Sequence, residues 1–183
     1  MLRAVVRIGV MVLALVVSVS AQTPAKPSPG AALIGKKVPA LTLSDFSGKT
    51  STLASHLGKP TFISFWASWC GPCLKEMPEL NAALAAHKGE FQVLAIDMGD
   101  QLAAAENARK TRMAFDFQWF IDPEWQGNLM FGTKLGKAFS IPALPTAVWI
   151  AVDGTVIDYW NGLPDGEGAL TKKIDALLAR GGK

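Results

Sequence analysis

The feature that most constrains the fold of this chain is an apolar run, PTFISFW at residues 60–66, that leads directly into a helical pattern. The run has the length of a β-strand and barely alternates, which is typical of a central strand buried on both faces. Between residues 72 and 87, apolar side chains recur at helical spacing, and Leu74, Met77 and Leu80 form one stripe. A buried strand that passes at once into a helix indicates a layered α/β domain.

The rest of the chain repeats this alternation of strands and helices. Strands are expected at 38–43, 50–53, 60–66, 91–96 and 117–121 and on both sides of Asp153-Gly154. Helices are expected at 72–87 with a kink at Pro78, over 101–115 with Asp100 as the cap, after Asp122-Pro123, and over about 165–180. The last two strands should therefore form a hairpin, and a helix should end the domain.

The first 21 residues have the composition of an export signal. Arg3 and Arg7 precede an uncharged apolar run at 8–19, and small residues end the segment at Ala21. The run is too short to cross a hydrocarbon core of about 30 Å, for which a helix needs roughly 20 residues. We therefore expect residues 1–21 to be a signal peptide or an N-terminal anchor, either of which places the remainder outside the cytoplasm.

A stretch rich in proline, alanine and serine follows at residues 22–32, and we expect it to be a flexible linker to a single domain at 33–183. The formal net charge of +3 includes the two leader arginines, so the remainder is close to neutral. No cluster of lysine and arginine is left beyond the leader, which argues against a nucleic-acid partner.

Both cysteines of the chain, Cys70 and Cys73, lie in the stretch SFWASWCGPCLKEMP between the apolar strand and the helix. A disulfide between them would add little to stability, since the entropic gain grows with the length of the closed loop. A structural zinc site needs four ligands, but the chain has no second cysteine pair, and His56 and His87 are isolated from each other. Covalent haem attachment needs a histidine directly after the second cysteine, where this chain has Leu74. We therefore expect neither a metal site nor a cofactor.

The remaining interpretation of the cysteine pair is a redox couple. At the junction of a strand and a helix, the first cysteine lies at the helix N-terminus, where free backbone N–H groups and the helix dipole favour an anion. Such placement lowers the pKa of a thiol from about 8.5 toward about 7, which makes it a better nucleophile at neutral pH. We therefore expect Cys70, at the exposed tip, to attack a disulfide, and Cys73, one turn further in, to resolve the mixed disulfide.

The stretch FWASWCGPCLKEMP resembles the active site of the thioredoxin superfamily, in particular its extracytoplasmic TlpA/ResA-like branch. Pro78 lies five residues after Cys73, where thioredoxin-like helices carry a kinking proline, and FSIPALPTAVWIAVDGTVI resembles the family's cis-proline segment. The order of elements matches from about residue 33 to 180, with an insert near 100–121. The resemblance implies a thioredoxin-like α/β fold, in which helices flank a central mixed sheet that has an N-terminal β extension and a central insert.

The resemblance also implies a substrate-binding surface beside the cysteines. Pro145 would be the cis residue, and Leu144 would precede it. Together with Trp69, these two residues would bind an extended segment of the substrate and hold its sulfur in line with Cys70.

A third implication of the resemblance concerns Glu76, which lies three residues after Cys73. In TlpA/ResA-like proteins an acidic residue at this offset is implicated in proton handling, so Glu76 would move a proton to or from Cys73. Ser64 replaces the buried aspartate of cytoplasmic thioredoxin, which makes Glu76 the nearest substitute for that carboxyl group.

The expected function is that of a protein-disulfide oxidoreductase outside the cytoplasm. The dipeptide Gly71-Pro72 is that of the reducing thioredoxin and favours the reducing direction. The resemblance implies a membrane partner that supplies electrons, and clients such as apocytochrome c, copper-site assembly proteins or misoxidised proteins.

Three alternatives stay open at this point. The same cysteine pair could act as a disulfide oxidase or isomerase, since the fold performs exchange in either direction. A peroxidase of the related peroxiredoxin type would need a threonine three residues before its cysteine, where this chain has Ala67. A thioredoxin-like copper chaperone would need a wider cysteine spacing and a distant histidine ligand, so it is also disfavoured.

Overall fold

A computed structural model describes residues 29–122, 124 and 131–180, in which seven strands form one sheet of order β2-β1-β5-β4-β3-β6-β7. The strands are β1 (Thr42–Asp45), β2 (Thr50–Thr52), β3 (Thr61–Trp66), β4 (Gln92–Asp97), β5 (Gln118–Ile121), β6 (Thr146–Ile150) and β7 (Val156–Asn161). The α-helices are α1 (Gly71–Ala86), α2 (Leu102–Arg112), α3 (Lys134–Ala138) and α4 (Ala169–Ala179), and two short 3-10 helices are η1 (Pro29–Leu33) and η2 (Leu53–His56). The predicted leader at 1–21 lies outside the described residues.

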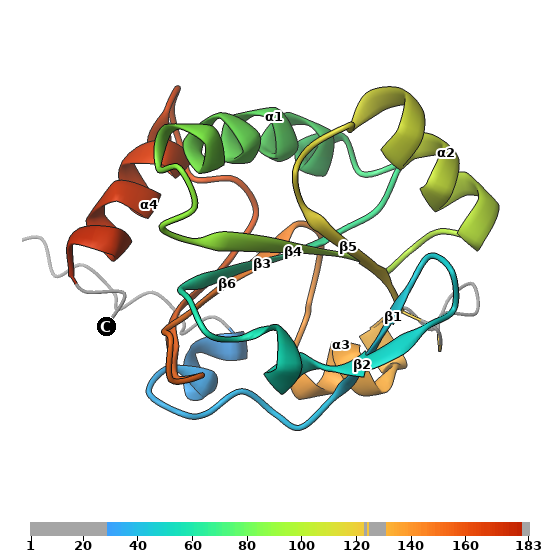
Figure 1. Ribbon diagram of the computed structural model, residues 1–183, viewed down its shortest axis with the longest axis horizontal. Helices are drawn as coiled ribbons and strands as arrows, with labels where there is room; N and C mark the ends of the chain where they lie inside the picture. The colour runs from blue at the N-terminus through green and yellow to red at the C-terminus, as the bar shows by residue number, and fades with distance from the viewer. Residues whose placement is uncertain (1–28, 123, 125–130, 181–183) are drawn as a thin grey trace, which may run out of the picture.

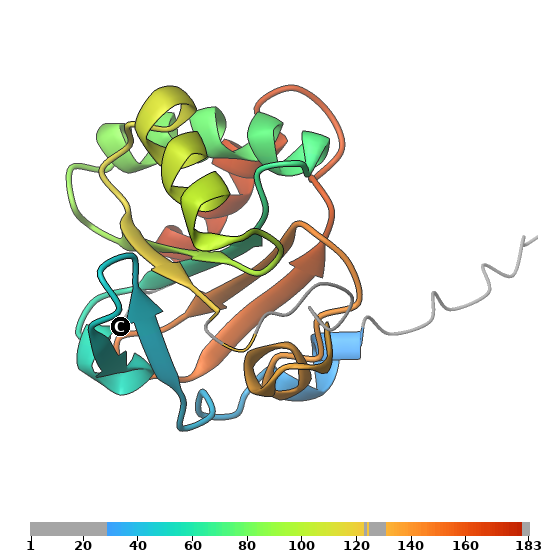
Figure 2. The same ribbon diagram turned by 90° about the vertical axis from the view of Figure 1, so that its right-hand side faces the viewer.

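The sheet is mixed and is covered on both faces, which confirms the expected fold class. Strand β3 is parallel to β4 and antiparallel to β6, and β1 joins β5 as the N-terminal extension. Figures 1 and 2 show α1, α2 and α4 on one face, and α3 with η1 on the other. The predicted hairpin across Asp153-Gly154 is β6 with β7.

The apolar run at 60–66 forms the centre of the sheet. All six residues of β3 are buried, because β4 and β6 flank it and helices cover both of its faces. Its alternate side chains enter two different core clusters, as Phe62 packs under α1 and Ile63 packs toward α3. Burial on both faces explains why the sequence of this strand does not alternate.

The structure corrects several predicted element boundaries. Strand β1 begins at Thr42 rather than at residue 38, and α4 begins at Ala169 rather than near residue 165. Gln101, not Asp100, occupies the N-cap position of α2, because the Asp100 carboxylate binds Ser68 instead. The start of the helix predicted after Asp122-Pro123 lies outside the described residues.

The described chain begins four residues before the predicted domain boundary. Residues 29–32, assigned to the linker, are part of η1, which packs against β7. A Cβ atom placed on Gly30 would lie 2.1 Å from the ring of Tyr159, so only glycine fits at this contact.

In the described part of the chain, no helix is both long and apolar enough to span a membrane.

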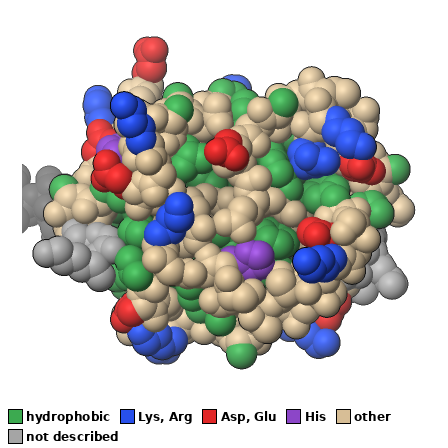
Figure 3. Space-filling model, in the orientation of Figure 1, with side chains coloured by type: hydrophobic (Ala, Val, Ile, Leu, Met, Phe, Trp, Pro, Cys, Tyr) green, Lys and Arg blue, Asp and Glu red, His purple; other side chains and the backbone are tan. Residues whose placement is uncertain are grey.

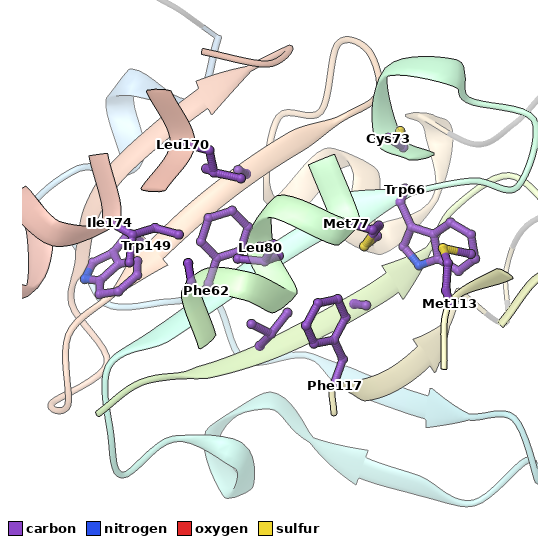
Figure 4. Close-up of a cluster of buried hydrophobic side chains, with 14 of the residues drawn as sticks. Phe62, Trp66, Cys73, Met77, Leu80, Met113, Phe117, Trp149, Leu170 and Ile174 are labelled. Carbon is purple, nitrogen blue, oxygen red and sulfur yellow. The ribbon is translucent and has the colours of Figure 1, made fainter. Parts of the chain in front are cut away.

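Side chains of both charges are interspersed on the face of the molecule that Figure 3 shows, with apolar side chains between them. Most of the larger apolar side chains are inside, in two clusters on opposite faces of the sheet. Figure 4 shows the cluster under α1 and α4, with Cys73 beside Trp66 and Met77 at one end and Ile174 at the other. The redox cysteines are therefore part of the main core and not of a surface loop.

The packing of α1 on the sheet leads to a stability prediction. Leu80 is fully buried in the cluster under α1, whereas Leu102 at the start of α2 is 48% exposed. We expect Leu80→Ala to lower the free energy of unfolding by about 2–5 kcal/mol, because it removes buried methyl groups and leaves a cavity. Urea unfolding of the oxidised protein measures this change. The matched control Leu102→Ala should change the free energy by less than about 0.5 kcal/mol, and equal effects of the two variants would contradict the described packing.

Candidate redox site

The two cysteines form a disulfide at the N-terminus of α1, so the structure is that of the oxidised protein. Cys70 is the N-cap residue, and its Sγ accepts a hydrogen bond from the backbone N–H of Cys73 at 3.2 Å. Pro72 lies in the first turn, where its missing N–H is not needed. Helix α1 continues through Pro78 to Ala86, so sixteen residues of aligned peptide dipoles end at the sulfur of Cys70.

The exposure of the site differs from the expectation of an exposed tip at Cys70. Cys70 is 4% exposed and Cys73 is 0% exposed, whereas Gly71 and Pro72 between them are exposed. The large exposed group at the site is the indole of Trp69, at 59%. Trp69 is exposed because its indole N–H donates to the Gly99 carbonyl at 2.9 Å, which holds the ring over the next loop instead of over the core. Cys70 nevertheless remains the more accessible of the two cysteines.

The peptide bond between Leu144 and Pro145 is cis, as the resemblance implied. Pro145 directly precedes β6, whose first residue Thr146 pairs with Phe65 near the end of β3. The cis bond and the cysteines therefore lie at the same end of the neighbouring strands β3 and β6. Leu144 is half-buried and packs against both core clusters, one of which contains both cysteines.

Glu76 is a fully buried carboxyl group behind the cysteines. It lies three residues after Cys73, so the two side chains share one face of α1. Its Oε1 accepts a hydrogen bond from the Ser64 hydroxyl at 2.7 Å, and Ser64 is itself fully buried in β3. Its Oε2 is also buried and has no hydrogen-bond partner among the described residues.

Burial raises the pKa of Glu76 to about 7, and only partial compensation comes from the hydrogen bond of Ser64. A carboxyl group with this pKa can give or take a proton at neutral pH. The pairing also gives a physical reason for serine at position 64, where cytoplasmic thioredoxin has an aspartate. A carboxylate at this position would place two buried acids side by side.

All six predicted site residues lie near the end of β3 and the start of β6, or on the helix that begins there. Cys70, Cys73 and Glu76 are on or at the cap of α1, Trp69 directly precedes them, and Leu144 and Pro145 precede β6. Their roles in catalysis and substrate binding stay predictions. Among the described residues, no group of three or more His, Cys, Asp or Glu side chains could hold a metal ion.

Sequence reasoning missed the acidic turn that follows β4. Asp97 and Asp100 are both buried, and the carboxylate of Asp100 accepts the backbone N–H and the hydroxyl of Ser68, two residues before Cys70. The sequence signal was present, because two aspartates directly after a buried strand are unusual unless their carboxyl groups have partners. From the sequence, Asp100 is predicted only as a helix cap.

Comparison with known proteins places these features in one family. The profile of the AhpC/TSA family matches residues 34–159. The thiol-disulfide oxidoreductase ResA of Bacillus cereus is 33% identical over 126 residues, which are 68% of this chain and 68% of that protein. Two solved structures share the fold. A protein assigned as the thiol:disulfide interchange protein DsbE of Chlorobium tepidum has a TM-score of 0.66 at 24% identity, covering 80% of this chain and 96% of its own. A thiol-disulfide oxidoreductase of Bacteroides fragilis has a TM-score of 0.63 at 23% identity, covering 78% and 99%.

The buried carboxyl group of Glu76 leads to a pH prediction. The folded protein keeps the Glu76 proton up to its pKa of about 7, whereas an exposed glutamate releases it near 4.5. The unfolded chain therefore binds fewer protons between these values, and the free energy of unfolding should fall as the pH rises through them. In Glu76→Gln this contribution, on the order of 3 kcal/mol, is absent, so the variant should lose less stability between pH 5 and pH 8.

Urea unfolding of the oxidised proteins at pH 5 and pH 8 measures the effect without interference from thiol titration. The matched control is Glu167→Gln, at an exposed glutamate before α4, which should keep the wild-type pH dependence. A Glu76→Gln variant with that same dependence would show that the carboxyl group is ionised in the folded protein at pH 5.

Proposed function

This chain belongs to the AhpC/TSA family and is a TlpA/ResA-like thiol-disulfide oxidoreductase of the thioredoxin superfamily, and on that basis we propose that it reduces protein disulfides outside the cytoplasm. The observation that carries the proposal is the Cys70–Cys73 pair at the N-terminus of α1, beside the exposed indole of Trp69. In the reduced protein this arrangement would combine a sulfur anion stabilised by the helix with a surface on which a client can dock.

In the first step the thiolate of reduced Cys70 attacks one sulfur of a client disulfide. A bond forms between Cys70 Sγ and that sulfur, and the client's other sulfur leaves as a thiolate, which takes a proton from water. The hydrogen bond from the Cys73 N–H and the dipole of α1 support the anionic form of Cys70. Trp69 and the backbone beside Leu144 and Pro145 would hold the client segment during this attack.

In the second step Cys73 attacks Cys70 Sγ and displaces the client. The Cys70–Cys73 disulfide forms, the client leaves with both of its sulfurs reduced, and two electrons have passed from the protein to the client. Cys73 must lose its proton to attack, and because its side chain is fully buried, a neighbouring side chain is well placed to accept it. Glu76 on the same helix face is the proposed acceptor, because its pKa of about 7 suits transfer at neutral pH.

The reducing direction is supported by the Gly71-Pro72 dipeptide between the cysteines. Thioredoxin, which carries it, has a potential of about −270 mV, whereas the strong oxidant DsbA has about −120 mV. A reductase that works outside the cytoplasm must be reduced again after each turnover. We propose that a membrane protein with a dithiol of its own supplies the electrons.

The predicted export signal at 1–21 supports a location outside the cytoplasm, with the chain secreted or held at the membrane surface. Proteins whose cysteines must be reduced before a cofactor is inserted are suitable clients in that compartment. Apocytochrome c awaiting haem is the first candidate, and copper-site assembly proteins are the second. The chemistry itself requires no cofactor.

Trapping of the client tests the order of the two steps. A Cys73→Ser variant should accumulate a mixed disulfide through Cys70, because the resolving thiol is missing. Mass spectrometry of the adducts after alkylation measures the trapped fraction and identifies the client. Glu76→Gln with both cysteines present should form the same adduct at the normal rate but release it more slowly.

The matched control for trapping is Cys70→Ser, which should accumulate no adduct. Adducts in Cys70→Ser but not in Cys73→Ser would reverse the assignment of attacking and resolving thiols. Consumption of hydrogen peroxide by the wild-type protein, with no reduction of insulin, would instead favour a peroxidase.

The reduction potential of the Cys70–Cys73 couple tests the direction of transfer. We expect a value near that of thioredoxin, about −270 mV, from equilibration with glutathione or dithiothreitol. A potential of about −150 mV or higher would contradict the reductase proposal and would identify an oxidase or isomerase.

A further inference from the structure

The turn between β4 and α2 holds the loop that presents Cys70. Asp100 in this turn accepts two hydrogen bonds from Ser68, one from the backbone N–H and one from the hydroxyl, the latter at 2.7 Å. The Ser68 carbonyl accepts a third bond, from the Arg112 guanidinium at 3.3 Å. Ala67 then accepts the N–H of Cys70 at 3.1 Å, so Ser68 lies inside the turn that ends at the attacking sulfur.

Gly99 brings the two loops into direct contact. Its carbonyl accepts the indole N–H of Trp69 at 2.9 Å. A Cβ atom on Gly99 would lie 2.8 Å from the Trp69 ring and 2.9 Å from Cβ of Ala67, so no larger residue fits without moving the loop. Trp69 and Ser68 are thus held by neighbouring residues of one turn.

Asp97 holds the turn itself. Its Oδ1 accepts the backbone N–H groups of Gly99 at 3.0 Å and Asp100 at 2.9 Å, and its side chain is fully buried. Its Oδ2 receives no hydrogen bond from the described residues. Burial, and next the neighbouring carboxyl group of Asp100, raise the pKa of Asp97 to about 8. At pH 7 Asp97 therefore carries a proton.

We infer that Asp100 is a positioning residue of disulfide exchange, which fixes the Ser68–Trp69 segment so that Cys70 meets a client disulfide in line, and that Asp97 holds Asp100 in place by accepting the backbone N–H groups of the turn. The inference rests on the proposed function, and neither aspartate touches the reacting sulfurs. A carboxylate suits this role because its two oxygens accept both donors of Ser68 at once. A protonated partner keeps the buried pair from carrying two charges.

The test uses reduced protein with the Cys73→Ser substitution, in which Cys70 is the only thiol. Its rate constant is measured with a peptide disulfide and with iodoacetamide at the same pH. The thiolate fraction affects both reactions and cancels in their ratio, whereas in-line docking matters only for the disulfide. Asp100→Ala should lower the ratio about tenfold, since displacement of a reacting group by about 1 Å can cost up to a hundredfold.

Ser68→Ala loses only the hydroxyl bond and should lower the same ratio about threefold. Added to Asp100→Ala, it should have no further effect, because the two side chains act through one contact. Asp97→Asn keeps an acceptor oxygen for the N–H groups of Gly99 and Asp100, so it should retain the wild-type ratio, whereas Asp97→Ala should not.

The matched control is Asp153→Ala. Asp153 also accepts a backbone N–H and a hydroxyl, both from Thr155, but in the β6–β7 turn. That turn is at the opposite end of the sheet, since Ile150 pairs with Thr61 at the start of β3. The control should keep the wild-type ratio even if it lowers stability.

An unchanged ratio in Asp100→Ala would overturn the inference, as would an equal fall in Asp153→Ala. If Asp100→Ala does not fold, Ser68→Ala provides the test, and an unchanged ratio in that variant overturns the inference. If Asp97→Asn lowers the ratio as much as Asp97→Ala does, Asp97 does not act as inferred. Insulin reduction by the wild-type protein tests the proposed function separately, because the ratios compare intrinsic reactions of Cys70 and keep their meaning without it.

Discussion

The hydrogen bond from the Cys73 N–H to the sulfur of Cys70 is the interaction on which the chemistry of this protein depends. It requires that a helix begin at Cys70, and that in turn requires a buried strand to end a few residues earlier. The apolar strand β3 and the long helix α1 are therefore parts of one device. The fold delivers the positive end of a helix to one sulfur at the edge of the sheet.

The interior of the protein contains polar groups that a structural core would not need. Glu76 and Ser64 form a hydrogen-bonded pair in the centre of the molecule, and Asp100 with Ser68 forms a second one where β3 and β4 end. Burying such groups costs free energy, and an apolar replacement of similar shape would often be more stable. Both pairs lie behind or beside the cysteines, which is where proton transfer and fixed geometry are useful. The protein therefore gives up stability at its functional site, as enzymes commonly do.

Much of the fold and the cysteine site could be predicted from the sequence, because the signals are local. The apolar strand, the helical stripe and the cysteine spacing each depend on neighbouring residues, and the cis bond before Pro145 followed from a resemblance carried by a contiguous motif. The burial of Cys70 and the partner of Asp100 could not be read in this way. Ser68 and Asp100 are 32 positions apart, and only the parallel pairing of β3 with β4 brings them together. An aspartate that caps a helix and an aspartate that holds a distant loop cannot be told apart from the sequence alone.

The position of Leu144 has a consequence for how a client would be recognised. Its side chain packs against the core clusters on both faces of the sheet, so the loop before β6 is held by contacts with both clusters. A partner that docked there would meet a loop that is already held by packing on both sides. Little conformational entropy on the protein's side is then lost on association, and a short, extended peptide with few contacts of its own could be held long enough to react.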